Sequence, residues 1–479
     1  MTISQITSQE SASNSGIKPM PTFVVTAMCW LFAILFGIWC LPHTVFIRHT
    51  AMGLGAVLGL YVIGYLWKNG LLKMQINAAP IFLILALFIW VTIHLVWIGK
   101  DPELQWFEYA RIWKKIFICF PFALGLGLGI RYIIQSGDEQ QSIKLWRIFY
   151  FGLCLPTIIF FIKYGLTKWS IAQQIELSPY LVLSEDLSFP SGIPKYALVF
   201  FSLPALAVGL GAITHSLVSN TFAIKDYASY CLMIILTPII FYIQADRNGM
   251  VYTSVLVLIA IVVSALSTLK GRSAKSMAVL AALIIFLFGA MMASYQANPA
   301  WKIFMADMKV ALQLDEIDNW KYQGRVPYPV NEYGIPVNPS NYDRATWALA
   351  GFNLVPENPW GYGLMNLSFD HLTKAKWPGS FMSHTHSAWL DFTLGYGILG
   401  VALLAIALVL TWRSSSVLMK PWTYFGRWGL GVLGLVMCTT EISSEIYINA
   451  LIYVTTIFAG LTMSLSSVTL KSPTMQKAL

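Results

Sequence analysis

Two histidines lie directly before a long apolar stretch, in the segment Ser383-His-Thr-His-Ser387. A neutral imidazole can remove a proton from a hydroxyl group near neutral pH. We place His386 in the first turn of an apolar helix over His386–Leu410, where the helix dipole disfavours the imidazolium form. His386 is therefore our candidate general base, and His384 is the alternative. A histidine at the start of a helix is otherwise an interfacial or capping residue.

A tight turn between two apolar runs holds the first candidate anion ligand. The turn reads Gln244-Ala-Asp-Arg-Asn-Gly249, and its few residues hold Arg247 near the headgroups of a bilayer. A guanidinium group matches two phosphate oxygens at once. Arg247 is thus a candidate phosphate ligand. Alternatively, it forms an ion pair with Asp246, or its side chain only extends to the membrane surface.

A second arginine lies in the stretch from Asp343 to Gly363, which predicts a short amphipathic helix carrying Arg344 and Trp347, followed by a glycine-rich turn. Arg344 is either a second phosphate ligand or a solvated helix residue. Arg325 competes weakly for the same role. Glu441, near the last two apolar runs, is a possible supporting residue that would orient an arginine or an acceptor sugar.

The composition indicates that these residues belong to a membrane protein. Of 479 residues, 57% are hydrophobic and 11% are charged, and the mean hydropathy is +0.65. So few charges cannot cover a water-facing surface. The net charge of +9 is spread in short clusters between apolar runs, which disfavours a nucleic-acid partner. The six cysteines show no CxxC spacing, so the sequence suggests no metal site.

Runs of about 20 apolar residues predict about twelve transmembrane helices in an all-α, polytopic fold. The candidates are Thr22–Leu41, His49–Trp67, Ala79–Trp97, Ile116–Ile134, Leu145–Ile162, Tyr196–Ile213, Ala228–Gln244, Met250–Leu269, Ser276–Ala293, His386–Leu410, Gly426–Thr440 and Ile446–Leu465.

The distribution of Lys and Arg in the short loops favours a cytoplasmic location for both termini. The predicted order is a cytoplasmic tail (1–21), nine helices (22–293), a large periplasmic loop domain (294–385), three helices (386–465) and a second tail (466–479). The loop is rich in Pro, Asn, Trp and Tyr, so we expect a small folded domain. Residues Asp101–Lys115 predict an interfacial amphipathic helix.

Three segments in this order resemble the O-antigen ligase and polymerase superfamily. They are the arginine turn at 244–249, the Asp343–Gly363 stretch with its Asn-Pro-Trp-Gly-Tyr-Gly turn, and His386-Ser followed by glycines at 395, 397 and 400. The long loop before the histidine helix agrees with the family layout. The resemblance implies a fold like that of the GT-C glycosyltransferases, in the bacterial inner membrane, with the active site facing the periplasm.

The resemblance also implies the reaction. Such enzymes move a glycan from undecaprenyl pyrophosphate to an acceptor hydroxyl, with neither a metal nor another cofactor. Carried onto this sequence, Arg247 and Arg344 hold the pyrophosphate, and His386 takes the acceptor's proton in an inverting displacement.

These motifs do not identify the acceptor. Lipid A-core, as for a ligase, is the leading expectation, and the other family activities are O-antigen polymerase and protein O-oligosaccharyltransferase. A protein of another functional class, a lipid-glycan flippase or transporter, would also agree with the predicted number of helices. A transporter places polar groups at mid-bilayer, whereas these candidates gather at one membrane boundary.

Overall fold

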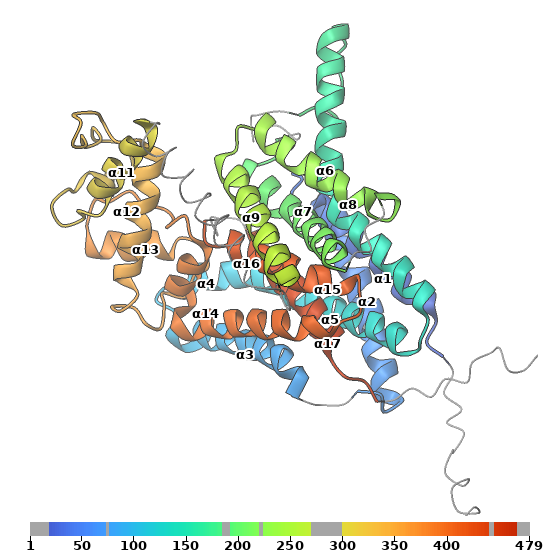
Figure 1. The fold of residues 1–479 in the computed structure, drawn as a ribbon. Helices are drawn as coiled ribbons and strands as arrows, with labels where there is room; N and C mark the ends of the chain where they lie inside the picture. The colour runs from blue at the N-terminus through green and yellow to red at the C-terminus, as the bar shows by residue number, and fades with distance from the viewer. Residues whose placement is uncertain are drawn as a thin grey trace, which may run out of the picture.

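The computed structural model describes residues 19–72, 76–183, 192–219, 224–269, 299–439 and 445–466. This part of the chain is helical, and two isolated β-bridges join described residues, Leu72 with Leu465 and Val330 with Pro336. The predicted ninth span, Ser276–Ala293, and most of both tails lie outside the described residues. The all-α fold is confirmed (Figure 1).

Eight of the described helices are long and apolar enough to cross a bilayer, so the protein is a multi-pass membrane protein. The helices that form these spans are α2 (Val45–Lys68), α3 (Ala79–Ile93), α5 (Lys114–Gln135), α6 (Glu139–Gln173), α7 (Lys195–Val218), α8 (Ile224–Ile243), α9 (Arg247–Leu269) and α14 (Ala388–Ser414). Two shorter apolar helices, α1 (Thr22–Ile38) and α17 (Glu445–Thr462), match the first and last predicted spans.

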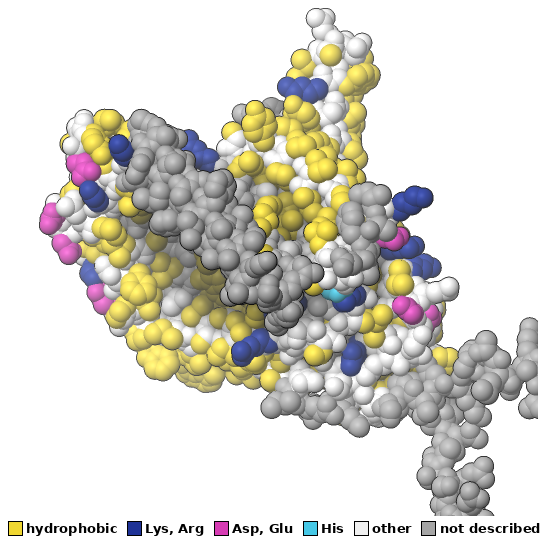
Figure 2. All heavy atoms as spheres, in the orientation of Figure 1, with side chains coloured by type: hydrophobic (Ala, Val, Ile, Leu, Met, Phe, Trp, Pro, Cys, Tyr) yellow, Lys and Arg dark blue, Asp and Glu magenta, His cyan; other side chains and the backbone are white. Residues whose placement is uncertain are grey.

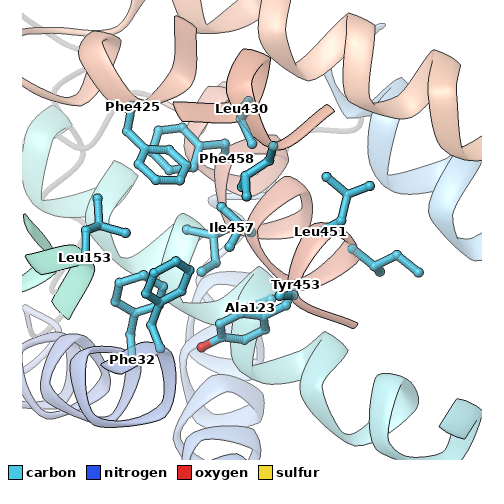
Figure 3. Packing of buried hydrophobic residues seen from close by; sticks show 14 of the residues in the cluster. Phe32, Ala123, Leu153, Phe425, Leu430, Leu451, Tyr453, Ile457 and Phe458 are labelled. Atoms are coloured by element: carbon cyan, nitrogen blue, oxygen red, sulfur yellow. The ribbon is translucent and has the colours of Figure 1, made fainter. Parts of the chain in front are cut away.

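Aromatic side chains fill the centre of the helix bundle (Figure 3). Phe32 of α1 stacks on Phe149 of α6, with 4.1 Å between ring centroids, and Phe425 stacks on Phe458 of α17 at 4.8 Å. Small residues let α2 and α5 approach closely, because a Cβ atom on Gly125 would lie 2.4 Å from the Cα atom of Gly59.

Three predicted boundaries differ from the structure. Helix α6 continues to Gln173, past the predicted end at Ile162. The eleventh span is a chain of short pieces, α15 (Trp422–Tyr424), a π-helical turn over Phe425–Gly429 and α16 (Leu430–Val436). The tenth begins at Ala388, two residues later than predicted.

The polar segment after residue 299 folds into three helices, α11 (Pro299–Ala311), α12 (Pro339–Leu354) and α13 (Ser368–Lys376), which we call the loop domain. It has its own hydrophobic core, which includes Trp320, Tyr342 and Trp347. In Figure 2 its outer edge carries charged side chains of both signs, whereas the surface over α9 is mostly hydrophobic.

Helix α14 is broken at Gly397, whose φ of +74° lies in the left-handed region. The turn 358–363 fills this break with three hydrogen bonds: Tyr362 N to Leu394 O at 2.8 Å, Gly363 N to Gly395 O at 2.7 Å, and Ile398 N to Pro359 O at 2.9 Å. The glycine-rich turn therefore fastens the loop domain to the bundle.

Side chains from the π-helical turn that follows α3 (His94–Ile98) and from α4 (Pro102–Glu108) secure the same turn. His94 Nε2 donates to the carbonyl of Trp360 at 2.6 Å. The carboxylate of Glu108 accepts the backbone N–H groups of Met365 and Asn366. The predicted amphipathic helix thus buries Gln105 and Glu108, while Trp106 and Arg111 remain exposed.

We expect Gly397→Ala to destabilise the protein. Its Cβ would lie 2.5 Å from the carbonyl oxygen of Pro359, and alanine disfavours a positive φ. The matched control is Gly64→Ala on α2, where no atom lies within 4 Å of the added Cβ. Thermal unfolding in detergent should show a lower Tm for Gly397→Ala and an unchanged or higher Tm for Gly64→Ala. Equal Tm values would contradict the role of the break.

Candidate active site

The turn between α8 and α9 is held in shape by Asp246. Its backbone N–H donates to Phe241 O at 2.8 Å, and its Oδ1 accepts the N–H of Gly249 at 3.1 Å. Among the described ion pairs none joins Asp246 to Arg247. Arg247, the first residue of α9, is exposed. Its guanidinium group is therefore available to a ligand.

Helix α12 of the loop domain reaches this turn. Arg344 Nη1 donates to Asn248 Oδ1 at 3.4 Å, a long contact across an exposed surface. Asn248 directly follows Arg247, so two arginines separated widely in the sequence lie at one place on the surface. Two neighbouring guanidinium groups repel each other unless an anion lies between them.

The histidine segment also contacts α12. The ring of His386 stacks on Trp347, with 5.2 Å between centroids and an angle of 5° between the planes. Trp347 is buried, and its Nε1 donates to Trp320 O at 2.9 Å, which fixes the plane of the indole. Since Arg344 lies three residues before Trp347, one turn of helix carries both the arginine and the platform for the histidine.

The expectation that His386 lies in the first helical turn is wrong. Ser387 is the N-cap of α14, and His386 precedes it with a φ of +59°, a region rare for residues other than glycine. Thr385 secures this conformation, because its backbone N–H and its hydroxyl both donate to Asp391 Oδ1, at 2.9 and 2.8 Å. Non-glycine residues in this region concentrate at functional sites.

Asp343 is a candidate residue that the sequence interpretation left without a role. Its Oδ2 accepts the hydroxyl of Tyr328 at 2.8 Å. Burial raises the pKa of Asp343, while the hydrogen bond from Tyr328 and the charge of His386 act in the opposite direction. Its position four residues before Trp347, on the same helix face, is the signal that could have indicated it.

The remaining candidates lie outside this cluster or beyond the described residues. Arg325 stacks its guanidinium on Phe381, 3.3 Å from the ring centroid, and no described contact joins it to the arginine turn. His384 is half-buried, two residues before the histidine that meets Trp347. Glu441 lies outside the described residues. Within the described ranges no three His, Cys, Asp or Glu side chains are grouped so that they could hold a metal ion.

The chain matches the O-antigen ligase family model over residues 232–405. The match includes Arg247, Arg344 and His386, so the resemblance to the O-antigen ligase superfamily is confirmed. It supports a ligase- or polymerase-type function in O-antigen or lipopolysaccharide assembly, carried out by a membrane enzyme of glycosyltransferase type. Comparison with curated proteins gives no match.

We expect Asp343→Asn to stabilise the protein at pH 7. Because burial raises the pKa of Asp343, the carboxyl group binds its proton more tightly in the folded chain than in the unfolded chain. The free energy of unfolding therefore falls as the pH rises from the unfolded-state pKa through the folded-state pKa. Asparagine does not titrate and keeps an oxygen for Tyr328.

The Tm of Asp343→Asn should exceed that of the wild type at pH 7, and the two should converge below about pH 3, where the carboxyl group is protonated in both the folded and the unfolded state. Asp315→Asn, an exposed carboxyl group of the loop domain, is the control and should change Tm little at either pH. A Tm difference for Asp343→Asn that is the same at both pH values would contradict the explanation.

Proposed function

We propose that this protein is an O-antigen ligase of the bacterial inner membrane, with its site facing the periplasm. In this proposal it transfers a glycan from undecaprenyl pyrophosphate to a hydroxyl group of lipid A-core. The single observation that carries the proposal is that α12 contacts both the arginine turn and His386, the two other segments of the family resemblance. This geometry supports a site in which the proposed anion ligands lie near the proposed proton acceptor.

The two arginines act on the donor. Arg247 and Arg344 are exposed and lie at the same turn, where they would bind the two phosphates of the lipid carrier. As the glycosidic bond breaks, negative charge grows on the departing pyrophosphate. Fixed positive charges stabilise that transition state more than the ground state, so the pyrophosphate departs without a general acid or a divalent metal.

His386 acts on the acceptor. The acceptor oxygen forms a bond to the anomeric carbon while the bond from that carbon to the pyrophosphate oxygen breaks. The proton of the acceptor hydroxyl passes to the imidazole, and the bonding electron pair leaves with the pyrophosphate. Attack opposite the leaving group inverts the anomeric configuration. Trp347 fixes the plane of the imidazole, and the negative charge of Asp343 favours the imidazolium that forms.

The matched control for the proposed base is another ring-stacked histidine of the loop domain, His371, which lies against Tyr362. We expect His386→Ala to lower the transfer rate by about 100-fold or more, the usual contribution of a general base. His384→Ala and His371→Ala should retain transfer. The measurement uses the purified chain with undecaprenyl-pyrophosphate-linked glycan and lipid A-core, without added divalent metal.

Full transfer by His386→Ala would overturn the assignment of the base, and loss of transfer in His384→Ala alone would move that role to His384. The product identifies the class of enzyme. Extension of a second lipid-linked glycan would make the protein an O-antigen polymerase, and a glycosylated protein would make it an O-oligosaccharyltransferase. Movement of the donor across vesicles without a covalent product would make it a transporter.

We expect Arg344→Gln to weaken donor binding and to lower transfer by about 100-fold, because glutamine keeps a donor group but removes the charge. Arg325→Gln is the matched control, since this guanidinium stacks on Phe381 in the same domain. Titration of the donor at saturating acceptor should give a changed KM or kcat for Arg344→Gln and values near wild type for Arg325→Gln. The reverse pattern would assign the pyrophosphate to Arg325.

A further inference from the structure

One cavity is lined by none of Arg247, Arg344 and His386. Its volume is about 780 Å³, and it is formed by the first half of α6, the first half of α8 and the segment around Pro421. Helix α8 begins at this cavity and ends at Ile243, just before the arginine turn. The 19 residues from Lys225 to Ile243 span about 27 Å at a rise of 1.5 Å per residue, close to the thickness of the hydrocarbon core. The cavity therefore opens at the opposite membrane boundary.

The mouth of the cavity carries positive charge. Arg147, Lys225 and Lys420 line it together with one carboxylate, Asp226, which leaves a net charge of +2. These four side chains are exposed and come from three separate segments. Among the described ion pairs none involves any of them. Such a convergence of unneutralised cations at a membrane boundary fits an anion.

The body of the cavity is apolar and open to the bilayer. One face of α6 lines it from Ile143 to Ile158, about 22 Å along the helix axis. Phe151 on α6 and Leu232 on α8 line the same groove and are 42% and 50% exposed. A free phosphate ion would gain nothing from this surface, whereas an acyl chain would cover it.

Aromatic side chains form a rigid floor between the charged mouth and the bundle. Trp146 Nε1 donates to the hydroxyl of Tyr230 at 2.8 Å, and the rings of Tyr150 and Tyr230 lie 4.7 Å apart. Tyr424, from the segment after α14, packs edge-on against Tyr230. These contacts hold α6, α8 and the segment near Pro421 together, so the shape of the cavity exists before any ligand arrives.

We propose that this cavity binds one anionic phospholipid, with its phosphate between Arg147, Lys225 and Lys420 and an acyl chain along the groove between α6 and α8. The site lies at the boundary opposite the proposed active site and does not depend on the transferase function. It would stabilise the contact of α6 and α8 with the segment that follows α14.

The test measures Tm in detergent as dioleoylphosphatidylglycerol is titrated into the purified full chain. This lipid should raise Tm, whereas dioleoylphosphatidylcholine and inorganic phosphate should not. Each basic side chain near a membrane contributes about fivefold in affinity, so replacing Arg147, Lys225 and Lys420 by glutamine should raise the half-maximal lipid concentration about 100-fold. The double variant Lys144→Gln, Arg413→Gln is the control, because these exposed residues do not line the cavity.

A second variant keeps every charge and fills the groove. Ser229 is an exposed residue that lines the cavity, so Ser229→Trp should abolish the lipid-dependent rise in Tm, while Ser254→Trp, exposed on α9, should preserve it. An equal rise with phosphatidylcholine would show a groove without headgroup preference, and an equal rise with inorganic phosphate would show an ion site. Either result, or a full response of the glutamine variant, would overturn the proposal.

Discussion

The break in α14 at Gly397 is the constraint on which the proposed site depends. A continuous helix would satisfy its own N–H and C=O groups and offer nothing to the loop domain. At the break, the turn 358–363 takes over three of those hydrogen bonds, and His94 and Glu108 hold the turn and the residues that follow it. The loop domain is thereby fastened next to the helix that follows His386.

Because the loop domain is attached in this way, its helix α12 positions the residues of the proposed site. One helical turn carries Asp343, Arg344 and Trp347. Asp343 interacts electrostatically with His386, Arg344 contacts the arginine turn, and Trp347 stacks on the imidazole. The core of the loop domain holds Trp347 in place, so packing remote from the surface determines the geometry of the site. A lipid-linked donor could reach such a site from the membrane, and a large acceptor could approach from the aqueous side.

The apolar runs and the three family segments made much of this predictable. Long hydrophobic stretches identify helices because a bilayer requires their backbone groups to be satisfied internally. Local patterns could not show that α6 extends to Gln173, that Glu108 turns inward to bind backbone N–H groups, or that His386 lies outside its helix. Each of these depends on contacts with distant segments. Asp343 was overlooked for the same reason, since a carboxylate beside an arginine also fits a solvated helix.

The central claim is that Arg247, Arg344 and His386 form one site for a lipid-linked pyrophosphate. The most direct measurement is a cryo-electron microscopy structure of the full chain with bound undecaprenyl-pyrophosphate glycan. The account predicts density for the two phosphates between Arg247 and Arg344, with the first sugar directed towards His386. Phosphate density away from both arginines, for example beside Lys168 and Lys195, would contradict it.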